Sequence, residues 1–251
     1  MKVTLLGTGT SYPDPERVQS GVLVEIEDMP ILLDAGSGIL HRLLQVVDDI
    51  TRIQHIFLTH FHIDHCSDFV TLCQTLWLSG LRDELKVYGP QAMDQWWEGV
   101  FDTAFSYLKG RFPIVRRKLG EYDQVKINEF TVHCVPTCHG DMDSRAYRVD
   151  YRDRSIVYSS DTAPCDEVAE LAKGVDLLIH ECNWLDGDHE KEVHTSPSEL
   201  ASIVAQAQPS QAVLVHVSPP VVDSMETVLS IVKGESDSEV ILGEDLMQII
   251  V

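Results

Sequence analysis

The sequence has no long hydrophobic run. Its 251 residues include no stretch of about 18 consecutive apolar positions, the length that a membrane-spanning helix requires. The first ten residues, MKVTLLGTGT, hold one lysine and an apolar run that is too short for a secretory signal peptide. We therefore expect a cytoplasmic protein with no membrane partner.

Cysteine is scarce and irregularly spaced. The six cysteines form no C-x-x-C pair, which argues against a cysteine-rich zinc knuckle and against a disulfide framework. In a cytoplasmic protein we expect them to be reduced thiols. Two of them, Cys66 and Cys138, stand next to histidines, and we interpret both as bystanders.

Basic residues are also few. The chain has 19 Lys and Arg against 40 Asp and Glu, a formal net charge of −21. Such a surface repels polyanions, which argues against DNA and against extended RNA as partners. The one basic cluster, RFPIVRRK at residues 111–118, is interpreted as the charged edge of a sheet that blocks aggregation, with a short nucleic-acid contact as the alternative.

What the sequence does contain is a series of short β-branched runs interrupted by segments of helical period. The expected strands lie at residues 3–6, 21–26, 31–33, 53–58, 85–88, 130–135, 146–149, 156–158, 175–179 and 212–215. The expected helices lie at residues 39–47, 68–78, 92–101, 165–171, 197–207 and 224–232. This order predicts an α/β (α+β) protein of mixed sheets covered by helices. No linker or repeat divides the chain, so we expect one domain over residues 1–251.

The stretch FLTHFHIDHCSDF, residues 57–69, gathers His60, His62, Asp64 and His65 directly behind an apolar strand. In an extended loop, residues two apart point to the same side, so His60 and His62 can face one point while Asp64 and His65 face a second. Imidazole and carboxylate ligands without thiolate suit a catalytic Zn²⁺, or Mn²⁺ or Fe, with an open coordination position. The alternative is a chance cluster of surface histidines.

A site for two metals needs further ligands, and three polar residues each follow another apolar run. They are His139, Asp161 and His216, and the carboxylate of Asp161 could bridge two ions. Taken alone, a residue of this kind at a strand end is more often a hydrogen-bonded structural residue than a ligand.

Several motifs together resemble the metallo-β-lactamase superfamily, and within it the branch of ribonuclease Z, the tRNA 3′-processing endonuclease. They are HxHxDH at residues 60–65, the isolated His139, SSDT at 159–162, HVSPP at 216–220, LLGTGTSYP, ILLDAGSGI, IHECNW at 179–184 and HTS at 194–196. The resemblance covers nearly the whole chain. It implies the metallo-β-lactamase fold, a four-layer αββα sandwich of two mixed β-sheets flanked by helices.

The resemblance also implies the roles of individual residues. It places one Zn²⁺ on His60, His62 and His139, a second on Asp64, His65 and His216, and Asp161 between them. Asp64 then also holds the nucleophile, His194 donates a proton to the leaving group, and Glu181 orients His194. The alternatives are a helix-start residue for His194 and a surface acid for Glu181. Asp34 in LLDAG is interpreted as a structural residue that ties loops behind the metals.

The implied activity is that of a metal-dependent hydrolase, a phosphodiesterase. Family members that process tRNA carry a long arm between the positions of His139 and Asp161, but here 161 − 139 = 22 positions leave room for a hairpin. Together with the negative charge, this favours a small or cyclic phosphodiester, or a short RNA 3′ end, over extended tRNA binding. The alternatives are a carboxylic ester, lactone or thioester hydrolase, and a non-catalytic metal-binding scaffold. Relatives are often dimers, so a homodimer is a further expectation.

Overall fold

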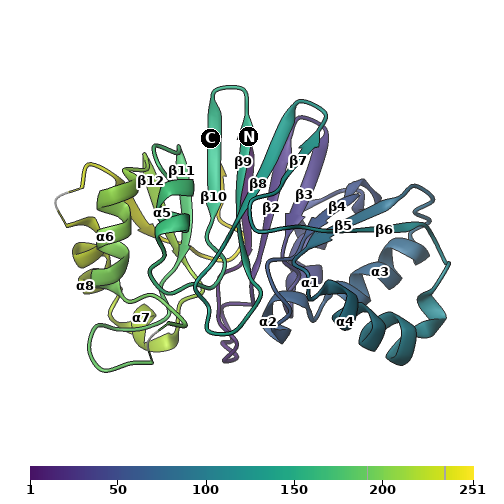
Figure 1. Cartoon of the computed structure of the whole chain (residues 1–251), viewed down its shortest axis with the longest axis horizontal. Helices are drawn as coiled ribbons and strands as arrows, with labels where there is room; N and C mark the ends of the chain where they lie inside the picture. Colours follow the sequence, from purple (N-terminus) through teal and green to yellow (C-terminus); the bar gives the residue numbers. More distant parts are fainter. Residues whose placement is uncertain (191, 235) are drawn as a thin grey trace.

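Two β-sheets face each other at the centre of the protein, and helices cover their outer faces (Figure 1). The computed structural model describes residues 1–190, 192–234 and 236–251, and within these ranges each sheet has seven strands. The predicted four-layer αββα sandwich is therefore confirmed. In Figure 1 the helices numbered up to α4 flank one sheet, and α5 to α8 flank the other.

The strands of the first sheet come mainly from the amino-terminal half of the chain. In spatial order they are β14 (Gln248–Ile250), β1 (Lys2–Gly7), β2 (Gly21–Ile26), β3 (Met29–Leu33), β4 (His55–Phe57), β5 (Leu85–Gly89) and β6 (Ile114–Lys118). Those of the second sheet are β13 (Glu239–Leu242), β12 (Gln211–Val215), β11 (Leu177–Glu181), β10 (Arg154–Tyr158), β9 (Arg145–Tyr151), β8 (Phe130–Pro136) and β7 (Gln124–Ile127). Both sheets mix parallel and antiparallel pairs.

The helices lie between the strands in sequence. They are α1 (Ile39–Val46), α2 (Ile63–Cys66), α3 (Phe69–Leu78), α4 (Met93–Trp97), α5 (Asp166–Leu171), α6 (Pro197–Ala207), α7 (Pro219–Asp223) and α8 (Met225–Lys233), with shorter turns η1 (Ile50–Arg52) and η3 (Ser106–Leu108) and a π-helical segment η2 (Glu98–Ala104). In the described ranges, no helix is both long and apolar enough to cross a membrane.

Apolar side chains fill three layers of core. One cluster lies between the two sheets and includes Val24, Phe57, Tyr147 and Ile179, all with at most 1% of their surface exposed. The other two large clusters lie between each sheet and its helices. Burying both faces of each sheet explains why its strands read as nearly continuous apolar runs. Polar residues are consequently displaced to the strand ends.

Each expected strand and helix has a counterpart, with ends shifted by a few residues. The strands and α-helices that sequence patterns missed are short: β7, β13, β14, α2 and α7. The basic cluster at residues 111–118 contains β6, the outermost strand of its sheet, as predicted. The interval from His139 to Asp161 holds the antiparallel pair β9 and β10, the expected hairpin.

One prediction about local structure was wrong. The loop after β4 is extended only as far as His62, which has φ −65° and ψ 149° and precedes helix α2. Asp64 and His65 therefore lie on one helical turn, not on an extended chain. The turn forms because the backbone N–H of His65 donates to the carbonyl of His62. The side chains of Asp64 and His65, although adjacent in sequence, can therefore face one common point, beside the point that His60 and His62 face.

Candidate metal centre

The candidate ligands meet at one edge of the two sheets, where strands end. The loop after β4 supplies His60, His62, Asp64 and His65, the segment between β8 and β9 supplies His139, and the ends of β10 and β12 lead into Asp161 and His216. All seven residues that the sequence singled out as ligands are brought together, in two groups that share Asp161. All but His62 are buried.

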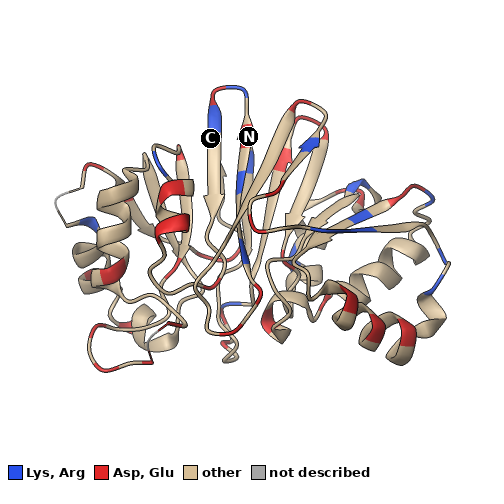
Figure 2. Cartoon of the chain, viewed as in Figure 1, with Lys and Arg blue, Asp and Glu red and all other residues tan. Residues whose placement is uncertain are grey.

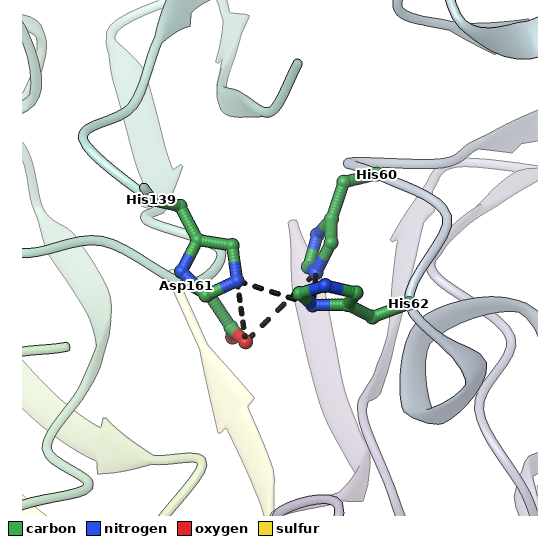
Figure 3. A group of neighbouring side chains, drawn as sticks. All are labelled: His60, His62, His139 and Asp161. Atoms are coloured by element: carbon green, nitrogen blue, oxygen red, sulfur yellow. Dashed lines mark hydrogen bonds and ion pairs between the residues drawn. The ribbon is translucent and has the colours of Figure 1, made fainter. Parts of the chain in front are cut away.

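The first group consists of His60, His62, His139 and Asp161 (Figure 3). Nδ1 of His62 lies 3.1 Å from Nε2 of His60 and 3.1 Å from Nε2 of His139. A tetrahedral zinc ion with bonds of about 2.0 Å spaces its ligand nitrogens about 3.3 Å apart. Nδ1 of His139 donates to the carbonyl of Val193 at 2.7 Å, which leaves its Nε2 free to bind a metal.

The second group consists of Asp64, His65, His216 and Asp161. Nε2 of His216 lies 3.2 Å from Oδ2 of Asp64 and 3.4 Å from Oδ2 of Asp161. Nε2 of His65 lies 3.2 Å from Oδ1 of Asp161. Imidazole and carboxylate donors are thus in place around two neighbouring points, and a carboxylate stands between them.

The donor set fits divalent cations electrostatically. Burial, together with the neighbouring imidazoles, holds the pKa of His60 well below its usual value, so that the ring is neutral and able to bind a metal. For His65, burial acts in the same direction, but the carboxylates of Asp161 and Asp34 outweigh it and raise its pKa well above the usual value. A positive charge is therefore favoured between His65 and Asp161. Nε2 of His65 and Oδ1 of Asp161 are both buried without a hydrogen-bond partner, as expected of metal ligands.

A buried carboxylate supports the site from behind. Asp34 accepts hydrogen bonds from Nδ1 of His65 at 2.8 Å and from the hydroxyls of Thr59 at 2.9 Å and Tyr158 at 3.0 Å. Because the Thr59 hydroxyl donates to Asp34, it is free to accept from Nδ1 of His60, 3.0 Å away. Asp34 therefore ties loops behind the candidate ligands, as its position in LLDAG suggested. No sequence pattern indicated Thr59 or Tyr158, whose roles depend on the fold.

Three non-glycine residues around the centre have left-handed backbones. Asp34 has φ 61°, Ser160 has φ 59° and His216 has φ 49°. Such conformations are uncommon for residues with a Cβ and persist where the surroundings impose them, often at functional sites. Each of the three lies just beyond a strand, where the chain turns to direct a side chain to the centre.

His194 and Glu181 form a pair beside the two ligand groups. Nδ1 of His194 donates to Oε1 of Glu181 at 2.7 Å. Burial alone lowers the pKa of His194, but the charge and hydrogen bond of Glu181 outweigh burial and raise it to about 9. Glu181 has no exposed surface, so the alternative of a surface acid is wrong. His194 does precede helix α6, which begins with a capping box between Ser196 and Glu199.

A cavity of about 300 Å³ opens over these residues. Its lining is Ser11, His62, Ile63, Asp64, His139, Asp161, Val193, His194 and His216, which include no lysine or arginine. Ile63 is 72% exposed at its rim. A larger hollow of about 690 Å³ lies beside α6 and α8, but the described residues that line it include no histidine, cysteine or glutamate. Volume alone therefore does not identify the site; the convergence of donor atoms does.

Comparison with known proteins agrees with this geometry. The Beta-lactamase superfamily domain family matches residues 30–217, more than half of the chain. A protein named Ribonuclease Z from Methanosarcina acetivorans is 27% identical over 300 residues, covering 99% of this chain and 97% of the relative. Another protein of that name, from Ignicoccus hospitalis, is 27% identical over 263 residues, covering 86% and 88%.

Solved structures show the same architecture. The metallo-β-lactamase fold protein YhfI from Bacillus subtilis is 23% identical with a TM-score of 0.84, covering 99% of this chain and 98% of YhfI. The short form of human tRNase Z is 25% identical with a TM-score of 0.81, covering 100% and 99%. The protein thus belongs to the β-lactamase superfamily, is similar to proteins named Ribonuclease Z, and has the metallo-β-lactamase fold.

Proposed function

We propose that the protein is a metal-dependent phosphodiesterase with two divalent ions, Zn²⁺ by preference, that cleaves a small or cyclic phosphodiester or a short RNA 3′ end. The relatives named Ribonuclease Z support hydrolysis of a phosphodiester bond. The single observation that carries the proposal is the His194–Glu181 pair, because His194 lines the same cavity as members of both ligand groups and Glu181 holds it from behind. Hydrolysis that must expel an alkoxide requires such a proton donor.

In this proposal, His60, His62 and His139 hold one ion, Asp64, His65 and His216 hold the other, and Asp161 serves both. Two such ions, when bound, activate a water nucleophile and stabilise charge on the phosphoryl oxygens. Asp64 lines the cavity, where its carboxylate would accept a hydrogen bond from an attacking water and so orient it.

His194 protonates the leaving oxygen. Its Nδ1 hydrogen is engaged by Glu181, so its Nε2 hydrogen is the one available to the substrate. The buried carboxylate of Glu181 stabilises the imidazolium form and fixes the ring plane. The backbone N–H groups of Thr162 and Thr195 donate to the Glu181 carboxylate at 2.8 and 3.2 Å. These hydrogen bonds stabilise the charge of the carboxylate and hold it in position.

The surroundings of the cavity favour a small substrate. A lining without lysine or arginine leaves the ions and His194 to neutralise phosphate, which suits the single charge of a diester. Figure 2 shows acidic residues on helices α4 and α5 and basic residues along β6. With a net charge of −21, the protein offers little cationic surface for a long polyanion. The hairpin of β9 and β10 fills the interval where tRNA-processing relatives are expected to carry an arm.

The test is hydrolysis of bis(p-nitrophenyl) phosphate by protein loaded with Zn²⁺ or Mn²⁺, beside Asp64→Ala and, as a matched control, His41→Ala, which removes an exposed histidine outside the site. We expect metal-dependent turnover that Asp64→Ala abolishes and His41→Ala preserves. Full activity in Asp64→Ala contradicts the proposed role of Asp64. Hydrolysis of p-nitrophenyl acetate, with no turnover of the diester, would instead favour a carboxylic ester hydrolase.

A further inference from the structure

Three side chains outside the candidate metal centre converge on another point. They are Cys138, Cys165 and Glu167, whose two sulfur atoms and one carboxylate oxygen all lie within 4.8 Å of one another. Sγ of Cys165 lies 3.2 Å from Oε2 of Glu167. None of the three belongs to either ligand group described above. The interpretation of Cys138 as a bystander therefore does not account for its position.

The backbone holds these side chains together from two separate segments. Cys138 and Ala163 form an isolated β-bridge, in which the N–H of Ala163 donates to the carbonyl of Cys138 at 2.6 Å. The N–H of Cys138 donates to the hydroxyl of Thr162 at 3.1 Å. Cys165 follows two residues later and Glu167 lies in the first turn of α5. The three donors are thus positioned by contacts that need no ion.

Their chemistry is that of a zinc ligand set. Thiolates prefer Zn²⁺ to the hard ions Mg²⁺, Ca²⁺ and Mn²⁺, and a carboxylate is a common third ligand. Bonds of about 2.3 Å to sulfur and 2.0–2.2 Å to oxygen place tetrahedral donors about 3.5–3.8 Å apart. A separation within 4.8 Å therefore closes with small side-chain rotations. Cys165 is buried whereas Cys138 is exposed and Glu167 is partly exposed, so one side stays open for water as a fourth ligand.

We propose that Cys138, Cys165 and Glu167 form a separate Zn²⁺ site that braces the candidate metal centre. Cys138 directly precedes His139, and Cys165 lies four residues after Asp161. An ion bound here joins the segment carrying His139 to the segment carrying Asp161. Binding replaces the two thiol protons, which pass to solvent, and leaves zinc as Zn²⁺, so no oxidant or reductant is needed. The proposal does not depend on which bond the enzyme cleaves.

Cobalt substitution tests the proposal directly. The seven candidate ligands of the main centre contain no sulfur, so a sulfur-to-cobalt charge-transfer band in the near ultraviolet reports thiolate coordination elsewhere. We expect chelator-treated, reduced full-length protein to develop this band on titration with Co²⁺. Cys138→Ser and Cys165→Ser should lose the band, and Cys66→Ala, which removes the thiol beside His65, should keep it. Glu167 is partly exposed, so Glu167→Gln should weaken Co²⁺ binding at this site without unfolding the chain.

Metal content gives an independent reading. After loading with Zn²⁺ and passage through a desalting column, Cys165→Ser should retain one zinc per chain fewer than the unchanged protein. Cys66→Ala should retain the same number as the unchanged protein. A wild-type protein that binds Co²⁺ without the band contradicts the proposal, as does a band that survives both cysteine substitutions. Reduced protein that shows no band, yet forms a Cys138–Cys165 disulfide on exposure to air, would overturn it in favour of a redox pair.

Discussion

Nδ1 of His194 lies 2.7 Å from Oε1 of Glu181, although the two residues are 13 positions apart along the chain. The backbone N–H groups of Thr162, Asn183 and Thr195 also donate to this carboxylate, at 2.8, 3.2 and 3.2 Å. These backbone hydrogen bonds hold the Glu181 carboxylate in place independently of His194. A histidine held in this way presents its other nitrogen to the cavity, which makes its protonation state the first property to test.

Replacement of His194 should matter most when the leaving group is poor. An alkoxide needs a proton to depart, whereas p-nitrophenolate leaves near neutral pH without one. We expect His194→Ala to lower kcat by about 100- to 10,000-fold on a diester with an alcohol leaving group, such as a cyclic nucleotide. The loss should be much smaller on bis(p-nitrophenyl) phosphate. Steady-state kinetics on both substrates measures this difference; equal losses on both point to a structural role for His194.

Replacement of Glu181 should move the pH profile. The proton donor acts in its charged form, so activity falls as the pH rises through the pKa of His194. Burial lowers this pKa, but Glu181, with smaller effects from Asp161 and Asp64, raises it above 6.5 to about 9. In Glu181→Gln the opposing effect of burial remains, and the basic limb should move to lower pH. Bound ions repel the imidazolium in both proteins, so the difference between them persists.

The measurement is kcat/KM against pH for Glu181→Gln and the unchanged protein, with a diester that has an alcohol leaving group. Activity of the variant should approach that of the unchanged protein at low pH and fall behind it above neutrality. A uniform loss at every pH, with no displacement of the basic limb, would show that Glu181 supports the fold and does not tune His194.

Removal of Asp34 should weaken metal binding without touching a proposed ligand. Its carboxylate orients His65 at 2.8 Å, and loss of such a support typically lowers metal affinity about 10- to 100-fold. We expect Asp34→Ala to need correspondingly more metal for half-maximal activity and to recover at high metal concentration. Asp28→Asn, which changes an exposed carboxylate, is the control. Unaltered metal affinity in Asp34→Ala would mean that His65 is oriented by other contacts.

The mixed sheets covered by helices and the candidate ligands could be predicted from the sequence for a physical reason, whereas the four-layer αββα arrangement was implied by the resemblance to the metallo-β-lactamase superfamily. Buried strands end where polar residues begin, so His139, Asp161 and His216 stand out against the apolar runs before them. The spacing of the histidines and the aspartate in HxHxDH likewise indicated ligands in the loop after β4. Contacts between distant segments gave no such signal. The hydrogen bond from Tyr158 to Asp34 joins residues 124 positions apart and became visible only in the folded chain.

Local conformation was harder to predict than placement. The four residues of α2 are too few to show a helical period, so the loop was expected to be extended throughout. The edge strands β13 and β14, with four and three residues, are too short to show a strand period. The convergence of Cys138 on Cys165 depends on a β-bridge between loops, and 27 positions of sequence separate the two thiols.

Substrate size should distinguish this protein from tRNA processors. We expect turnover of small or cyclic diesters at salt concentrations near 0.15 M and weak binding of precursor tRNA under the same conditions, because the surface is strongly acidic. Filter binding and product analysis on denaturing gels measure both. Tight binding and accurate 3′ cleavage of precursor tRNA would show that a basic surface such as β6 replaces the arm.

The most direct test of the central claim is reconstitution with Mn²⁺, which thiolates disfavour and which therefore fills the histidine and carboxylate sites selectively. Chelator-treated protein is titrated with Mn²⁺ while bound metal and the hydrolysis of bis(p-nitrophenyl) phosphate are followed together. The account predicts no activity without metal and full activity when two ions are bound per chain. Turnover by metal-free protein, or two bound ions with no turnover of any phosphodiester, would contradict it.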